Sequence, residues 1–144
     1  MIRKALFTAA GLVCCCAFVL PTRPAEQLEP NKIAVFTEAQ AIGGKAEYSK
    51  TCATCHTDSL IPAEGAKYQG HDIPPLAGAT FMEKWGALTT KDLTARVKIA
   101  AGEETYVPVT AYILQFNGAP AGEQQLTSDT AVEIRSITKL NGPF

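Results

Sequence analysis

Cys52-Ala53-Thr54-Cys55-His56 places two thiols three positions apart, with a histidine directly after the second thiol. On a helical turn, this spacing sets the thiols on adjacent edges and projects the imidazole beside them. Two such thiols can form thioethers with the vinyl groups on neighbouring sides of one porphyrin, while the imidazole ligates the iron. C-x-x-C-H therefore predicts one covalently attached haem c, held by Cys52 and Cys55, with His56 as an iron ligand.

Two other uses of paired cysteines fit the rest of the chain less well. A thioredoxin-like redox pair would need a strand before it and an α/β pattern around it, and the sequence indicates neither. A structural zinc site would need a second pair of ligands. His71 is the only other histidine, and the remaining cysteines, Cys14 to Cys16, lie in an apolar run near the N-terminus.

Residues 1–25 have the pattern of an export signal. The basic pair Arg3-Lys4 precedes an uncharged apolar run from Ala5 to Leu20. As a helix this run would span roughly 24 Å, which is less than the roughly 30 Å hydrocarbon core of a membrane. We therefore expect a signal peptide, with an N-terminal membrane anchor or a lipid-modified cysteine as open alternatives. In each case the protein is predicted to be exported to the periplasm.

Composition and charge narrow the class of partner. The 144 residues, 47% apolar and 19% charged, are typical of one globular domain. The net charge is −1, and loss of residues 1–25 would leave ten basic residues against fourteen acidic ones. No nucleic acid partner is expected, because nucleic acid binding requires a concentrated basic patch. A mildly acidic protein is compatible with a redox partner that has a basic rim.

The pattern of apolar residues predicts an all-α protein with long loops: a linker over residues 26–42 and one domain over residues 43–144. Residues 59–75 contain prolines and glycines and are expected to form a loop, and no strand is expected. A chain with long loops and little regular structure has a small core of its own, and a haem would add apolar bulk to it. Four helices are expected: from about Gly43 into the cysteine motif, from Thr90 or Lys91 to Ala100, from Tyr106 to Phe116, and from Thr127 or Ser128 to Thr138. Thr90 is the expected N-cap of the second helix, and Gly102 is expected to end it. A short turn or helix is expected at residues 81–85.

Several segments, taken in order, resemble a known family. They are Tyr48 to His56, Pro74 to Gly78, Phe81 with Trp85-Gly86, Asp92-Leu93, and Ala111 to Gln115 followed by Asn117 to Gly122. Together they resemble class I cytochrome c, and more closely the small monohaem cytochromes associated with periplasmic quinoprotein dehydrogenases. The resemblance covers roughly residues 43–140. It implies a cytochrome c-like fold, in which an N-terminal helix crosses a C-terminal helix near Tyr48 and Tyr112, and loops surround one haem.

The resemblance also implies roles for particular residues. Pro74 or Pro75 would offer its own or the preceding carbonyl to His56. Trp85 would pack beside the haem and direct its N–H at a propionate. The alternatives without a cofactor role are a stiff loop for the two prolines and an ordinary core position for the tryptophan.

The second axial ligand of the iron cannot be carried over from the family. Class I cytochromes usually supply a methionine from the loop before the C-terminal helix, and here that stretch, residues 99–105, contains none. Met82 is the only methionine beyond the expected signal, so it is a candidate ligand, although a lone methionine usually fills a core. His71, Lys98 and an open or water-occupied position are the other possibilities.

These observations favour an electron-transfer protein rather than an enzyme. The expected function is to carry single electrons in the periplasm between a dehydrogenase and a respiratory acceptor, such as a downstream oxidase or another cytochrome. A methionine ligand would suit this role and raise the potential. An open sixth position would instead give a five-coordinate haem protein that binds a small ligand or reacts weakly with peroxide.

Overall fold

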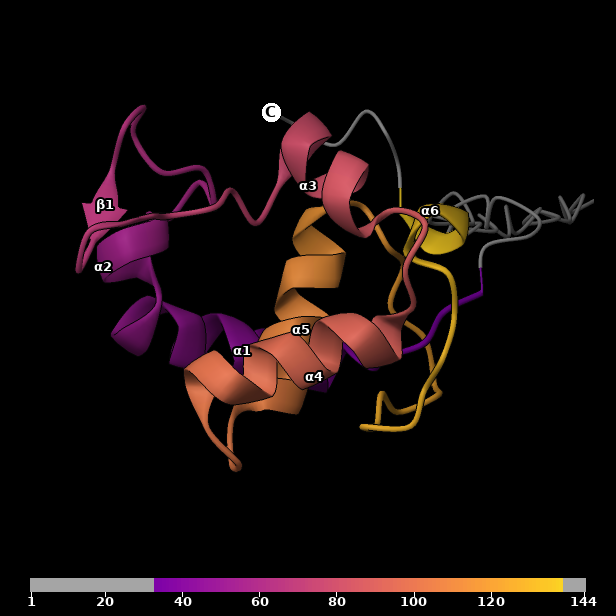
Figure 1. Cartoon of the computed structure of the whole chain (residues 1–144). Helices are drawn as coiled ribbons and strands as arrows, with labels where there is room; N and C mark the ends of the chain where they lie inside the picture. The colour runs from indigo at the N-terminus through magenta and orange to yellow at the C-terminus, as the bar shows by residue number, and fades with distance from the viewer. Residues whose placement is uncertain (1–32, 139–144) are drawn as a thin grey trace, which may run out of the picture.

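The computed structural model describes residues 33–138; the expected export segment, the first part of the linker (residues 26–32) and residues 139–144 lie outside this range. The described part is mostly helical, which confirms the predicted all-α class (Figure 1). None of its helices is long and apolar enough to cross a membrane. Its elements, in chain order, are α1 (Glu38–Thr51), α2 (Ala53–His56), β1 (Lys67–Tyr68), β2 (His71–Asp72), α3 (Gly78–Trp85), α4 (Thr90–Ala101), α5 (Tyr106–Phe116) and α6 (Ile134–Ile137).

Helix α1 begins before Gly43, so the predicted start of this helix was wrong, and the end of the expected linker belongs to the folded part. Thr37 caps the helix: its hydroxyl accepts from the N–H of Gln40, and the Gln40 side chain accepts from the N–H of Thr37. The Gln40 amide also bonds both backbone groups of Leu126. These contacts anchor the start of α1 to the C-terminal part of the chain.

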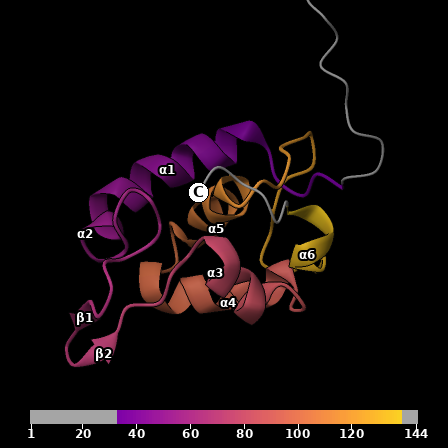
Figure 2. The ribbon, with the colours of Figure 1, turned by 90° about the horizontal axis from the view of Figure 1, so that it is seen from above.

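Helix α1 crosses α5 at a point where α1 has no side chain (Figure 2). Gly44 is buried at this crossing, and a Cβ atom there would overlap the backbone of Pro108. One turn further along α1, the ring of Tyr48 lies 5.2 Å from that of Tyr112, centroid to centroid. The two tyrosines therefore lie near the helix crossing, as the resemblance implied.

Helices α4 and α5 end as the sequence predicted, to within one residue. Gly102 ends α4 with a φ of 84°, a conformation that glycine adopts without strain. Helix α5 has the predicted bounds and is followed by Asn117. The segment predicted as a short turn or helix at residues 81–85 is helical as well. It forms α3, which begins at Gly78, three residues before the predicted start.

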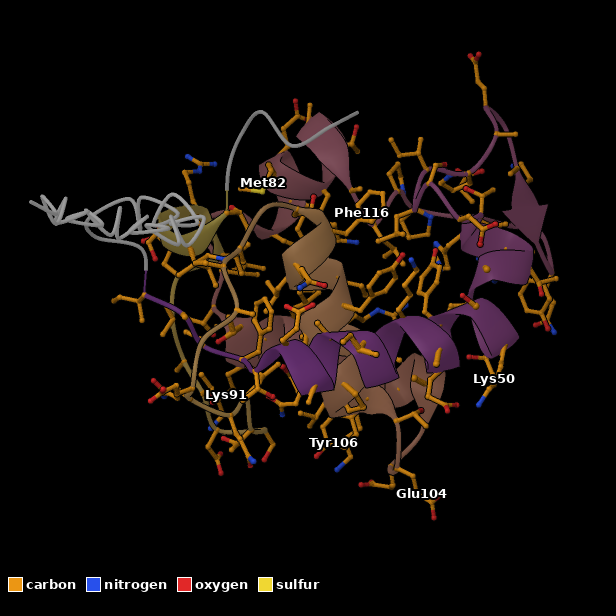
Figure 3. All side chains as sticks on the ribbon, turned by 180° about the vertical axis from the view of Figure 1, so that it is seen from behind. Lys50, Met82, Lys91, Glu104, Tyr106 and Phe116 are labelled. Atoms are coloured by element: carbon orange, nitrogen blue, oxygen red, sulfur yellow. The ribbon has the colours of Figure 1, made fainter. Side chains whose placement is uncertain are left out.

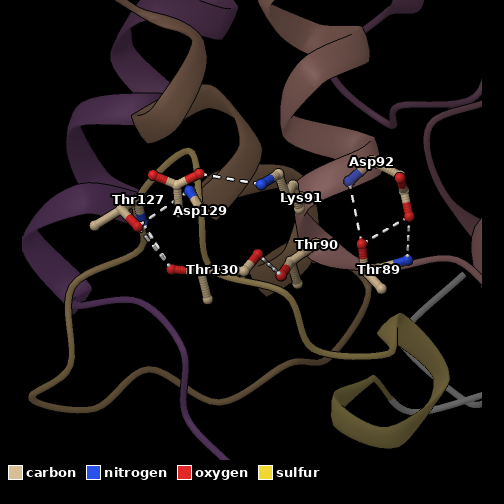
Figure 4. Close-up of polar contacts among 7 residues, drawn as sticks. All are labelled: Thr89, Thr90, Lys91, Asp92, Thr127, Asp129 and Thr130. Atoms are coloured by element: carbon tan, nitrogen blue, oxygen red, sulfur yellow. Dashed lines mark hydrogen bonds and ion pairs between the residues drawn. The ribbon is translucent and has the colours of Figure 1, made fainter.

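The N-cap of α4 is Thr89 rather than the predicted Thr90. The hydroxyl of Thr89 accepts from the N–H of Asp92, and the Asp92 carboxylate accepts from the N–H of Thr89 at 2.9 Å (Figure 4). Thr90 is fully buried instead, and its hydroxyl donates to the Thr130 carbonyl at 2.6 Å. The buried threonine thus joins the start of α4 to the C-terminal segment.

The predicted helix from residue 127 or 128 to 138 was wrong, because only its last part, α6, is helical. Thr127 and Thr130 form a turn in which the N–H of Thr127 donates to Oγ1 of Thr130 at 3.0 Å (Figure 4). Val132 then accepts from the N–H of Thr90 and donates its own N–H to the Thr90 hydroxyl. Backbone groups that are bonded to α4 are not available for a helix of their own.

A small hairpin interrupts the predicted loop over residues 59–75. Strands β1 and β2 pair antiparallel, with Lys67 opposite Asp72 and an ion pair of 3.2 Å between their side chains. The connecting residues, Gln69 and Gly70, both have positive φ, which is typical of tight hairpin turns. The prediction that this segment contains no strand was therefore wrong.

Candidate functional site

The cysteine motif forms one helical turn, α2, directly after α1. The N–H of Cys52 donates to the Tyr48 carbonyl at 2.8 Å, and the N–H of His56 donates to the Cys52 carbonyl at 2.9 Å. Cys52 and Cys55 are half-buried free thiols. The turn ends at Thr57, whose carbonyl accepts from the buried Tyr48 hydroxyl at 2.8 Å. Tyr48 therefore holds the motif at both ends.

The imidazole of His56 is oriented by the carbonyl of Pro74, which lies 3.1 Å from Nδ1. A carbonyl oxygen can only accept, so Nδ1 carries the proton and Nε2 keeps its lone pair in the neutral ring. Burial lowers the pKa of His56, against the opposing effect of the bond to Pro74, and so favours the neutral ring. A neutral imidazole with a free Nε2 is the form that ligates a metal.

The accepting carbonyl belongs to Pro74 and directly precedes Pro75, one of the arrangements that the resemblance implied. Asn117 fixes this loop from the end of α5: its Oδ1 accepts from the N–H of Gly78 at 3.2 Å, and its Nδ2 donates to the Leu76 carbonyl at 2.9 Å. Pro75 is half-buried and does not line the groove described next. Of the roles predicted for Pro75, only the one through the preceding carbonyl, that of Pro74, therefore fits the structure.

Cys52 and His56 face a groove that α3, α4 and α5 also line, with about 670 Å³ of empty space, part of it open to solvent. Trp85, the predicted neighbour of the cofactor, lines the same groove, as does Pro74. The structure therefore brings four of the expected residues together, and Cys55 follows on the same turn. The aliphatic part of the lining consists mainly of Leu76, Leu93, Val97, Ala100, Val109 and Ile113.

Met82, the first candidate for the distal ligand, lies in the core. It is on α3 (Figure 3), is only 4% exposed, and does not line the groove. Its sulfur accepts from the hydroxyl of Thr138 at 3.5 Å. This placement matches the alternative in which the methionine fills space between packed elements.

His71 and Lys98 do not line the groove either. His71 is exposed on β2. The amine of Lys98 forms an ion pair with Glu103 at 2.9 Å and lies 5.3 Å from the centroid of the Tyr106 ring. The Glu103 carboxylate also raises the pKa of Lys98, which keeps the amine protonated and unable to ligate a metal. Within residues 33–138, the structure brings none of the predicted distal ligands into the groove.

Two cationic residues, Lys84 on α3 and Arg96 on α4, line the groove and were not predicted. The amine of Lys84 lies 5.6 Å from the centroid of the Trp85 ring. Arg96 shares a helix face with Leu93 and Ala100, and this helical spacing could have indicated its place. No sequence pattern marks Lys84. Among the described residues, none of those lining the groove is an aspartate or a glutamate.

If the protein carries the predicted haem, Met82→Ala is expected to leave its visible spectrum unchanged and to lower the free energy of unfolding by about 2–5 kcal/mol. The reason is that the methionine is buried in the core and its loss leaves a cavity. Absorption spectra and denaturant unfolding measure the two effects. Leu88→Ala, at a position that is 41% exposed, is the matched control and should cost much less. A changed axial-ligand spectrum in Met82→Ala would show that the methionine reaches the iron after all.

Comparisons with protein families, with curated proteins and with solved structures found no match for this chain. What the site can do therefore follows from its residues. The described fold is mostly helical, and it combines the free thiol of Cys52, an oriented neutral imidazole and a tryptophan at one largely apolar groove, with the free thiol of Cys55 on the same turn. This set of groups defines a candidate cofactor site that has two free thiols and an imidazole at one end and aliphatic walls.

Proposed function

We propose that this protein is a monohaem c-type cytochrome with a class I cytochrome c fold, whose haem is attached through Cys52 and Cys55. The donor set fits this group, because two free thiols and an imidazole lie on one turn beside a groove with apolar walls. Each thiol would add across one vinyl group, with its hydrogen going to the other vinyl carbon, so that attachment needs no oxidant. The observation that carries the proposal is the bond from His56 to Pro74, which leaves Nε2 free for iron.

The bound haem would supply a one-electron iron couple. The aliphatic side chains of α4 and α5 would keep water away from the iron and so tune its potential. Cys52 and Cys55 are only half-buried, so the haem edge that they hold would lie near the surface, where electrons can be exchanged. The proposed function is to carry single electrons in the periplasm between a dehydrogenase and a downstream oxidase or cytochrome.

The test of this function needs protein from a host that matures c-type cytochromes. We expect the haem to survive acid–acetone extraction. We also expect a periplasmic quinoprotein dehydrogenase, supplied with its substrate, to reduce the haem as fast as the enzyme turns over, as measured by stopped-flow absorption. Reduction that lags behind turnover, with the haem attached, would contradict the electron-carrier role alone. Haem that extracts freely would contradict covalent attachment.

A five-coordinate haem protein that binds a small ligand or reacts with peroxide is the second candidate. One observation favours it: among the described residues that line the groove, His56 is the only histidine, and none is a methionine. Carbon monoxide separates the two candidates. Rapid and complete binding to the ferrous protein is expected for an open sixth position, and slow or partial binding for a position that a side chain occupies.

A further inference from the structure

The groove has a charge imbalance that the haem proposal leaves unused. Two cations line it and no carboxylate does. Most other lysines in residues 33–138 are neutralised locally: the four ion pairs are Lys50–Glu47, Lys67–Asp72, Lys91–Asp129 and Lys98–Glu103. Neither Lys84 nor Arg96 forms an ion pair with a residue of the described part. The groove therefore keeps a net positive charge in a chain that carries −1 overall.

The two cations come from different helices that line the groove. Lys84 lies next to Trp85 on α3, with its amine 5.6 Å from the centroid of that ring. Arg96 lies on α4, on the helix face that it shares with Leu93 and Ala100. Helix α4 lines the groove together with α2, which carries His56. Arg96 therefore belongs to the α4 wall of the groove that Cys52 and His56 face.

We propose that this wall forms a binding site for a small anion, with the guanidinium of Arg96 as its positive partner. The proposal rests on covalent haem attachment and on the open sixth position, and it names the ligand class: a small monoanion, for which azide is the probe. An anion gains from the guanidinium through charge-assisted hydrogen bonds. Leu93, Val97 and Ile113 line the groove beside Arg96, so the guanidinium is the charged group of an otherwise aliphatic wall.

The test is a spectrophotometric titration of the ferric holoprotein with azide, with neutral imidazole as comparison ligand. In Arg96→Gln the dissociation constant for azide is expected to rise roughly tenfold, while that for imidazole stays within about twofold. Arg96→Lys should keep most of the azide affinity because it keeps the charge. Lys45→Gln removes the same charge from an exposed position of α1 outside the groove, and it is the matched control. Arg96 is exposed, so these variants are expected to fold like the parent protein.

Three results would overturn the proposal. The first is an equal loss of azide affinity in Arg96→Gln and Lys45→Gln, which would mean a general charge effect. The second is a lower reduction potential in Arg96→Gln with unchanged azide affinity, which would assign Arg96 to the carboxylates of the haem. The third is a ferric protein that binds no azide although its haem resists acid–acetone extraction. In the third case the site is closed while covalent attachment stands, so the two failures are distinguishable.

Discussion

Replacing both Cys52 and Cys55 by alanine is expected to abolish covalent haem and to leave the chain largely unfolded. Both thiols are free and lie on the single turn that ends at His56, so no other described residue can take over the attachment. Without the haem the groove lined by α3, α4 and α5 loses the group that would fill it, and stabilisation of the folded state by binding is lost. Mass spectrometry measures attachment, and far-ultraviolet circular dichroism measures folding. Each single variant should keep at most one thioether.

The matched control is Thr54→Ala, which changes an exposed residue between the two cysteines and leaves both thiols in place. It should carry a full complement of haem after acid–acetone extraction. The attachment hypothesis fails if the double cysteine variant retains haem through the same extraction. It also fails if Thr54→Ala loses haem to the same extent, because the turn rather than the thiols would then be responsible.

The elements that the sequence predicted correctly are those whose limits are set locally. Gly102 ends α4 through its own backbone conformation. In α5, apolar residues recur at helical spacing from the first residue of the helix to the last. The start of α1 had a local signal as well, because Thr37 and Gln40 have the spacing of a capping box. The adjacent glycines, Gly43 and Gly44, predicted a later start of the helix instead. Both glycines fit in the helix, because Gly43 is exposed and Gly44 lies where α1 and α5 approach each other closely.

The wrong prediction for residues 127–138 has a different cause. The apolar spacing there is helical, but Thr90 and Val132 bond to each other across the fold, and hold the chain against α4. Such partners are not visible in a local pattern. The site likewise combines local and tertiary features: the cysteine motif can be recognised directly from five consecutive residues. By contrast, the core position of Met82 and the place of Lys84 in the groove depend on how α3 is rotated.

Gly44→Ala is expected to destabilise the folded protein by about 3 kcal/mol, a large effect for the addition of one methyl group. The new Cβ would overlap the carbonyl of Pro108 and press on Cβ of Tyr112, 3.0 Å away. The carbonyl is backbone within α5, so it cannot rotate aside, and the two helices would have to separate. Separation would also loosen the contact between Tyr48 and Tyr112 and, through Tyr48, the turn that carries the motif.

Gly43→Ala provides the control at the neighbouring position, since a Cβ there would have no atom within 4 Å. Alanine is preferred over glycine inside a helix, so this variant should gain about 0.5–1 kcal/mol. Urea unfolding of the two haem-loaded variants measures both changes, which are opposite in sign for the same substitution one residue apart. Equal stability of the two variants would mean that α1 and α5 do not meet at Gly44. Loss of stability in Gly44→Ala alone, together with an altered haem spectrum, would show that the crossing positions the turn from Cys52 to His56.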